Sequence, residues 1–166
     1  KTQALDLLNN SSMVFALVDE MYITRAGVFT GRYFSFKPTK EEVQKGYVIL
    51  GHRCMPFINP DTPPDRITLI SSGDIVFPEP VTFSMNLAMD VFALYGEGYV
   101  IPYILNDNAN ESVSIASLKY NMPSEVTLTA WPLNKIVGKG KKFRYGDRIL
   151  CSIMDWENNM VNVSVQ

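Results

Sequence analysis

Three reactive side chains stand next to one another at His52, Arg53 and Cys54, and His52 is the only histidine of the chain. A thiol beside an imidazole is a candidate nucleophile, because a neighbouring base or cation lowers the pKa of the thiol. We predict a β-strand from Tyr47 to Phe57, in which His52 and Cys54 share one face, about 7 Å apart, and Arg53 lies on the other. The apolar neighbours of Cys54 favour a raised thiol pKa instead. The sequence therefore favours a structural role, and an enzyme that uses Cys54 and His52 stays an alternative.

A second group, the basic–aromatic segment, runs from Trp131 to Arg148 with the sequence WPLNKIVGKGKKFRYGDR. From Lys135 to Arg148 it has six basic residues and one acid, a local net charge of +5, whereas the rest of the chain has nine basic and sixteen acidic residues. Basic side chains neutralise phosphates, and flat rings stack on unpaired bases. The predicted ligand-binding residues are Trp131, Lys135, Lys139, Lys141, Lys142, Phe143, Arg144, Tyr145 and Arg148.

Two other interpretations of the basic–aromatic segment stay open. In the first, it is a solvated hairpin loop whose lysines face water and whose aromatic rings turn into the core. In the second, it binds an acidic protein partner rather than nucleic acid or another polyanion. These interpretations differ in whether the cations and the rings share one surface.

The sequence lacks the motifs of several reaction classes. It contains no GxxxxGK[ST] phosphate loop, no GxGxxG fingerprint and no GxSxG nucleophile elbow. One histidine and two cysteines, Cys54 and Cys151, without CxxC or HxxxH spacing, fall short of a tetrahedral zinc site. We therefore predict no catalytic residue, no metal and no cofactor. Two free thiols are expected, with a single disulfide as the alternative.

The composition, 46% hydrophobic and 19% charged, is that of a globular protein. No apolar run approaches the roughly 18 residues of a membrane span, so no membrane-spanning segment is predicted. We expect a soluble protein, with a cytoplasmic location favoured, and the oligomeric state is not indicated. Because the chain begins at Lys1 rather than at a methionine, we expect a piece of a longer protein or a processed form.

Hydrophobic periodicity predicts a helical start followed by mainly β-structure. A helix is predicted over residues 2–27, with a break at residues 10–12. Thr39 and Glu42 have the spacing of a capping box, which predicts a short helix that ends at Gly46. Alternating apolar residues from Val81 to Val91 indicate one long strand, with a helix over residues 85–95 as the alternative. Further strands are predicted at residues 32–38, 67–71, 99–105, 113–120, 125–133, 147–156 and 160–165.

The predicted fold is mainly β (α+β), with antiparallel small-barrel or sandwich-like strands after an N-terminal helical segment. Residues 1–107 are expected to form a helical start plus a β-rich domain, and residues 112–166 a small antiparallel β-barrel-like subdomain. One continuous domain over residues 1–166 is the alternative. The end of the chain, KFRYGDRILCSIMDWENNMVNVSV, is similar over 24 residues to the closing strands of many small β-barrels, including S1-type OB folds. The aromatic–glycine strands with which S1 modules bind RNA do not appear upstream.

These features predict a non-catalytic binding or interaction domain of a larger protein. Its basic–aromatic segment is expected to contact nucleic acid or another polyanion, and an acidic protein partner is the other candidate. The alternative function is a structural or oligomerisation domain, in which exposed apolar residues form the interface.

Overall fold

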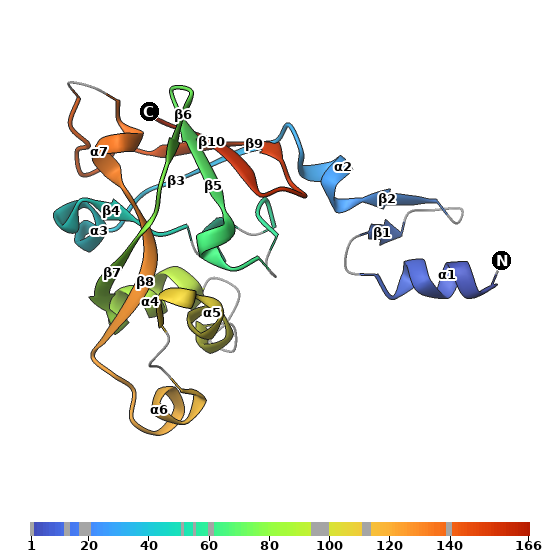
Figure 1. Ribbon diagram of the computed structural model, residues 1–166, viewed down its shortest axis with the longest axis horizontal. Helices are drawn as coiled ribbons and strands as arrows, with labels where there is room; N and C mark the ends of the chain where they lie inside the picture. The colour runs from blue at the N-terminus through green and yellow to red at the C-terminus, as the bar shows by residue number, and fades with distance from the viewer. Residues whose placement is uncertain are drawn as a thin grey trace.

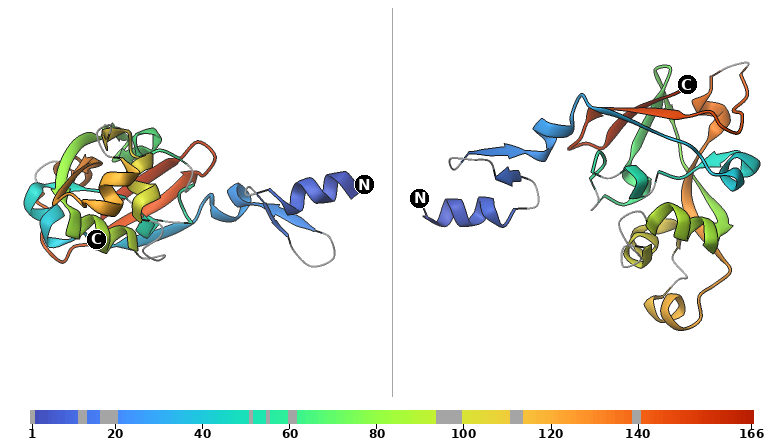
Figure 2. Two further views of the ribbon diagram at one scale, coloured as in Figure 1. Left: turned by 90° about the horizontal axis from the view of Figure 1, so that it is seen from below. Right: turned by 180° about the vertical axis from the view of Figure 1, so that it is seen from behind.

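The structure is a computed structural model with an α+β architecture, mostly antiparallel sheets and a helix at the N-terminus (Figure 1). A body built around two sheets is joined to an arm, which consists of α1 (Thr2–Asn9), β1 (Val14–Ala16) and β2 (Tyr22–Thr24) and projects to one side (Figures 1 and 2). The described part of the chain comprises residues 2–11, 14–16, 21–50, 52–54, 56–59, 62–93, 100–110, 114–138 and 141–166.

The larger sheet has five strands in the order β3–β9–β10–β5–β6. Neighbouring strands are antiparallel except β10 and β5, which are parallel. Parallel neighbours need a long connection rather than a tight turn, and these two strands lie far apart in sequence. Their bounds are β3 Tyr33–Phe36, β5 Thr68–Ser71, β6 Asp74–Val76, β9 Ile149–Asp155 and β10 Met160–Val165.

The smaller sheet has the order β4–β8–β7, with β8 (Glu125–Pro132) between β4 (Tyr47–Val48) and β7 (Glu79–Ser84). Because β4 is so short, it leaves part of one edge of β8 unpaired. Buried Asp107 covers that edge, since its carboxylate accepts hydrogen bonds from Thr129 N at 2.8 Å and Thr129 Oγ1 at 2.7 Å. A buried backbone N–H is thereby satisfied by a side chain instead of a strand.

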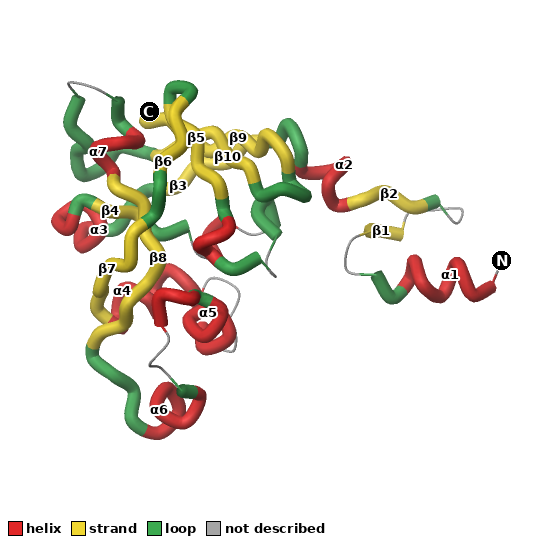
Figure 3. Tube along the Cα trace, in the orientation of Figure 1, coloured by secondary structure: helices red, strands yellow, loops and turns green. Residues whose placement is uncertain are grey.

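Helices α4, α5 and α6 lie together on the side of the smaller sheet (Figure 3). Their apolar faces and β7 and β8 form one buried cluster, which includes Phe83, Phe92, Ile104 and Leu128. A second cluster lies on the five-stranded sheet and includes Trp131 and Trp156. The helices and single turns of the body are α3 Lys40–Lys45, η2 His52–Cys54, η3 Pro64–Arg66, α4 Met85–Phe92, α5 Val100–Asn106, η6 Asn108–Asn110, α6 Ile115–Tyr120 and α7 Leu133–Ile136.

Helix α3 confirms the predicted capping box. Thr39 Oγ1 accepts from Glu42 N, and the Glu42 carboxylate accepts from Thr39 N at 2.7 Å. Gly46 ends the helix in the left-handed conformation at φ 76°, which a glycine adopts without a steric penalty.

The helix predicted over residues 2–27 is only partly correct. Helix α1 spans Thr2–Asn9, but β1 (Val14–Ala16) and β2 (Tyr22–Thr24) then form an antiparallel hairpin. A new helix, α2, begins at Arg25, with Thr24 Oγ1 accepting from Gly27 N, and it ends at Phe29. Gly27 therefore lies inside a helix rather than at its end.

The long strand predicted from Val81 to Val91 is wrong in its second half. Strand β7 ends at Ser84, whose hydroxyl caps α4 by accepting from Leu87 N at 3.1 Å. Within α4 the buried residues include Met85, Ala88 and Phe92, which follow helical spacing. Apolar and polar residues do alternate along this part of the sequence. The Ser84 cap and contact with the second core nevertheless favour the helical alternative as far as Phe92.

Two further strand predictions are wrong. Residues 99–105 were expected to be a strand, but α5 forms from Val100, with Pro102 in the first helical turn, where it displaces no helical hydrogen bond. Residues 113–120 were expected to be a strand, but Ser114 and Ser117 form a reciprocal cap and α6 follows. The strands predicted near β3, β5, β8, β9 and β10 are confirmed.

No closed barrel is formed among the described strands, and the barrel or sandwich stays a prediction. The division of the chain near residues 107–112 also stays a prediction. Strands from both sides of that division are paired within both sheets, β10 with β5 and β8 with β7.

Candidate ligand-binding site

Two hollows flank the single turn of α7, and both take residues from the predicted basic–aromatic segment. The first, which we call the basic hollow, has a volume of about 350 Å³. It is lined by Val43, Lys45, Gly46, Tyr47, Pro132, Leu133, Asn134, Lys141, Lys142 and Phe143.

The basic hollow collects positive charge and aromatic surface. Its cations are Lys45, Lys141 and Lys142, and its rings are Tyr47 and Phe143. No carboxylate is among the described residues that line it. Lys141 and Lys142 are exposed and form no ion pair with another described residue. The arrangement therefore leaves at least two lysine charges available to an anion.

Lys45 and Tyr47 are held in place by neighbouring groups. Lys45 Nζ donates to the carbonyl of Thr82 at 2.7 Å and lies 3.8 Å from the Glu41 carboxylate. The Tyr47 hydroxyl donates to the Glu79 carboxylate at 2.8 Å, and this hydrogen bond raises the pKa of Tyr47. Tyr47 is thus a neutral ring near physiological pH, and its fixed hydroxyl limits its rotation.

The floor of the basic hollow is built by backbone pairing. Tyr47 in β4 pairs with Pro132 in β8, and Leu133 N donates to the carbonyl of Gly46 at 2.8 Å. These contacts join the end of α3 to the start of α7. Phe143 is half-buried against the first core, so the segment that carries Lys141 and Lys142 is anchored by a ring.

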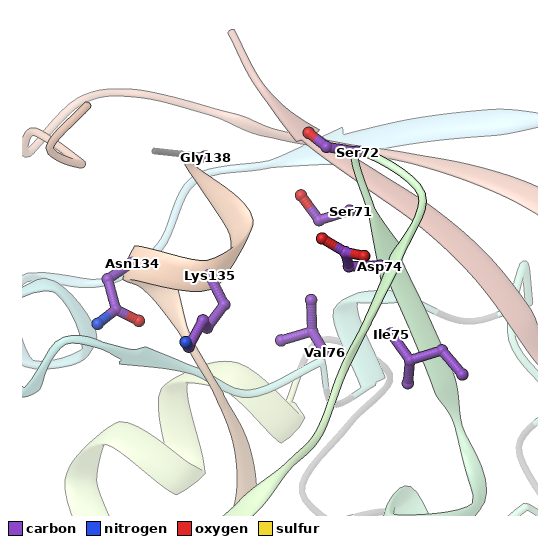
Figure 4. Close-up of a pocket in the computed structure, with 8 residues that line it drawn as sticks. All are labelled: Ser71, Ser72, Asp74, Ile75, Val76, Asn134, Lys135 and Gly138. Atoms are coloured by element: carbon purple, nitrogen blue, oxygen red, sulfur yellow. The ribbon is translucent and has the colours of Figure 1, made fainter. Parts of the chain in front are cut away.

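The second cavity, which we call the hairpin hollow, has a volume of about 510 Å³ and lies between the β5–β6 hairpin and α7 (Figure 4). Buried Ser71 ties the two walls together, because its hydroxyl donates to the carbonyl of Ile136 at 3.0 Å. Asn134 lines this cavity as well as the basic hollow. The hairpin hollow is lined by Ser71, Ser72, Asp74, Ile75, Val76, Asn134, Lys135 and Gly138.

The structure does not bring all the predicted ligand-binding residues together. Lys141, Lys142 and Phe143 share the basic hollow, whereas Lys135 lines the hairpin hollow. Arg144 and Tyr145 are exposed and line neither hollow.

The other three predicted ligand-binding residues are not found in either hollow among the described residues. Trp131 is fully buried at 0% exposure, so its ring faces the core and not a ligand. Arg148 is fixed on the five-stranded sheet, since its guanidinium donates to the hydroxyl and carbonyl of Ser35. Lys139 lies outside the described residues.

Sequence reasoning missed Lys45, Tyr47 and Asn134. Lys45 and Tyr47 reach the site through the α3 cap and the β4–β8 pairing, which bring together segments far apart in sequence. No local pattern contains that pairing, so only the tertiary structure reveals these residues.

The predicted strand over residues 47–57 stops at Val48, and His52–Cys54 form a single 3-10 turn. The predicted strand alternation at residues 52–54 is therefore wrong. Arg53 turns inward and forms an ion pair with buried Glu42, and it also donates to the carbonyl of Ile49. Its guanidinium carbon lies 4.2 Å from the centre of the Phe36 ring. The side chain of His52 lies outside the described part.

Both cysteines are buried free thiols. Cys54 Sγ donates to the carbonyl of Leu50 at 3.0 Å, and burial raises its pKa well above the usual value. Burial also raises the pKa of Cys151 to about 12. A thiolate is the reactive form of cysteine, so this environment opposes nucleophilic chemistry at either position.

Within the described residues, no group of three or more histidine, cysteine or acidic side chains is arranged to hold a metal ion. None of the described helices is long and apolar enough to cross a membrane. Comparisons of this chain with protein-family models, with curated proteins and with solved structures gave no match.

Proposed function

We propose that this chain is a non-catalytic binding module and that it binds single-stranded nucleic acid in the basic hollow. The observation that supports the proposal most is the meeting of three lysines and two rings in one hollow with no lining carboxylate among the described residues. Lysines compensate phosphate charge, and each stacked base contributes about 1–3 kcal/mol.

The geometry favours a flexible single strand over a rigid duplex. Single strands bind by combining a basic groove with stacking rings, because their bases are not hidden in a helix. A hollow of about 350 Å³ with half-buried Phe143 at its margin suits such an unpaired nucleotide. An acidic protein would use the lysines but would have less use for the two half-buried rings.

Binding of a labelled twelve-residue oligothymidylate tests this proposal by fluorescence anisotropy at several salt concentrations. With about two to three lysine–phosphate contacts, the logarithm of the affinity should fall with the logarithm of salt with a slope of about −1.5 to −2. The double variant Lys141→Glu/Lys142→Glu should lose most of the binding. The double variant Lys40→Glu/Lys119→Glu has the same charge change at two exposed lysines outside the hollow and should bind nearly normally.

The competitors decide which polyanion is bound. Unlabelled single strands should displace the probe at lower concentrations than a duplex or polyglutamate. If polyglutamate competes as well as oligothymidylate, the partner is an acidic protein. If the wild type binds none of these at low salt, the proposal is wrong.

The arm supports a second candidate function, self-association. Between residues 3 and 28, no described side chain is buried, and Leu7, Met21 and Ile23 are exposed. Phe15 packs against Phe29 of the first core, but a two-stranded hairpin with so few buried side chains is marginally stable in water, so this arm gains from a partner surface. Light scattering should then show a dimer that Met21→Glu/Ile23→Glu dissociates and that Met154→Glu, at an exposed apolar residue of β9, leaves intact. A monomer at high concentration would exclude it.

A further inference from the structure

We propose that the hairpin hollow is a base pocket that prefers guanine over the other bases. This inference rests on the proposed function, because it places one base of a strand whose phosphates occupy the basic hollow. It adds a sequence preference to what would otherwise be general binding of a polyanion.

The two hollows are close enough to serve one strand. Asn134 lines both, and only the four residues of α7, about 6 Å of helix, separate them. A strand that follows the lysines of the basic hollow therefore passes the opening of the hairpin hollow. The cavity of about 510 Å³ has room for a purine.

The hairpin hollow has a carboxylate and an ammonium group on opposite walls. Asp74 comes from the hairpin and Lys135 from α7, and both side chains are drawn in Figure 4. Neither forms an ion pair or a side-chain hydrogen bond with another described residue, and the two do not pair with each other. Both polar groups are therefore available to a ligand that carries donors and acceptors side by side.

Guanine fits this combination better than the other bases. Its Watson–Crick edge has two adjacent donors, N1–H and the N2 amine, and one acceptor, O6. The two oxygens of the Asp74 carboxylate accept from the donors, and the Lys135 ammonium donates to O6. Adenine and cytosine present one donor group each, and thymine presents a single N–H between two carbonyls that the carboxylate repels.

The walls of the hairpin hollow also suit a flat ring. Val76 points from β6 toward α7, on the same side as Asp74, and gives this wall an apolar side chain, whereas its neighbour Ile75 points the opposite way (Figure 4). Ser72 at φ 53° and Gly73 at φ 90° form the tight turn that a two-residue hairpin needs. With Ser71 bonded to α7, the carboxylate of Asp74 is held by a short, braced hairpin.

Four oligonucleotides test the preference: twelve-residue oligothymidylate and the same strand with one central guanine, adenine or cytosine. A single guanine avoids self-structure, and anisotropy gives each affinity. For the wild type we expect the guanine strand to bind about tenfold more tightly than oligothymidylate, with adenine and cytosine between them. Asp74→Asn should abolish the guanine preference, because an amide cannot accept from both donors.

The design separates base recognition from charge. Asp74→Asn removes a negative charge, so its affinity for oligothymidylate should stay the same or rise slightly. Asp90→Asn makes the same change at an exposed position of α4 and should keep the guanine preference. Lys135→Met retains the aliphatic stem and should weaken the preference as well. Circular dichroism of each variant verifies its fold.

The outcomes distinguish this inference from the proposed function. Salt-dependent binding of all four strands with equal affinity overturns the base pocket but leaves the proposed function standing. A guanine preference that survives Asp74→Asn also overturns it. If none of the strands binds, both the base pocket and the proposed function are wrong.

Discussion

Helix α3 contributes one charged side chain to each of two opposite environments. Glu42 points into the body, where it accepts from Thr39 N and Ile49 N and pairs with Arg53. Lys45, one turn later, lines the basic hollow beside Lys141 and Lys142, which have no ion pair with another described residue.

The difference between these environments separates charges that serve folding from charges available for binding. A buried charge is tolerated only when its partners are supplied, and removal of one partner leaves the other unpaired. Lys141 and Lys142 have no carboxylate partner among the described residues, so they gain nothing from folding and repel one another, whereas Lys45 is also held by Glu41 and Thr82. We therefore expect substitutions at the buried pair to change stability and substitutions at the basic hollow to change binding.

The largest effect is expected for Glu42→Ala. Loss of the carboxylate leaves buried Arg53 uncompensated and removes the acceptor of Ile49 N, which should lower the free energy of unfolding by about 3–5 kcal/mol. Urea denaturation measures this change. Glu125→Gln, at an exposed position of β8, is the control and should stay within about 0.5 kcal/mol of the wild type. A loss below about 1 kcal/mol would contradict a structural role for the pair.

The second-largest loss of stability is expected for Asp107→Ala, because it removes a second buried carboxylate. The partners of this carboxylate are backbone and hydroxyl groups rather than a charged side chain. Thr129 N and Thr129 Oγ1 would lose their acceptors, and stability should fall by about 2–3 kcal/mol in the same urea experiment. Burial raises the pKa of Asp107, so its stabilising effect is greatest at pH values below its ordinary pKa and decreases as the pH rises through the raised value. An advantage of the wild type that instead grows with rising pH would contradict this.

The thiols give a smaller effect, which depends on pH. Burial raises the pKa of Cys151 from 9.0 to about 12, so the unfolded chain loses this proton first. Stability from this thiol is fully present below pH 9 and is lost as the pH rises toward 12, about 1.4 kcal/mol by pH 10.

Comparison of the wild type with Cys151→Ala isolates this effect, since all other groups titrate in both proteins. The stability difference between the two should shrink between pH 8 and pH 10. Iodoacetamide should leave both native thiols unmodified and react with them in urea. Rapid alkylation of the native protein would show that Cys54 or Cys151 is more accessible than its buried position implies.

The parts of the fold that the sequence predicted correctly are those determined by neighbouring residues. The Thr39–Glu42 capping box depends on local side chains, and it formed where expected. Helices α5 and α6 were missed because each is one or two turns of mixed apolar residues, a pattern that also fits a strand. Contact with the second core decides between the two structures, and that core does not exist until the chain folds.

The lining of the candidate site was predictable to a similar extent from the sequence. The charge excess of the basic–aromatic segment located Lys141, Lys142 and Phe143, because clustering of charge is visible in the sequence. It also wrongly included Trp131, which is fully buried, since composition does not show which way a ring points. Lys45 and Tyr47 came from another segment, and Glu42 was recognised only as a helix cap and not as the partner of Arg53.

The smallest change in stability is expected for Lys141→Glu/Lys142→Glu, the variant with the largest expected loss of binding. Both side chains are exposed and lack ion pairs with other described residues, so the free energy of unfolding should change by no more than about 0.5 kcal/mol. A slight gain is expected, because the new carboxylates relieve repulsion near Lys45. Urea denaturation and anisotropy on the same preparation measure both quantities. Should this variant lose more than about 2 kcal/mol of stability, its lysines would have to contribute to folding, and the division between the two environments of α3 would no longer hold.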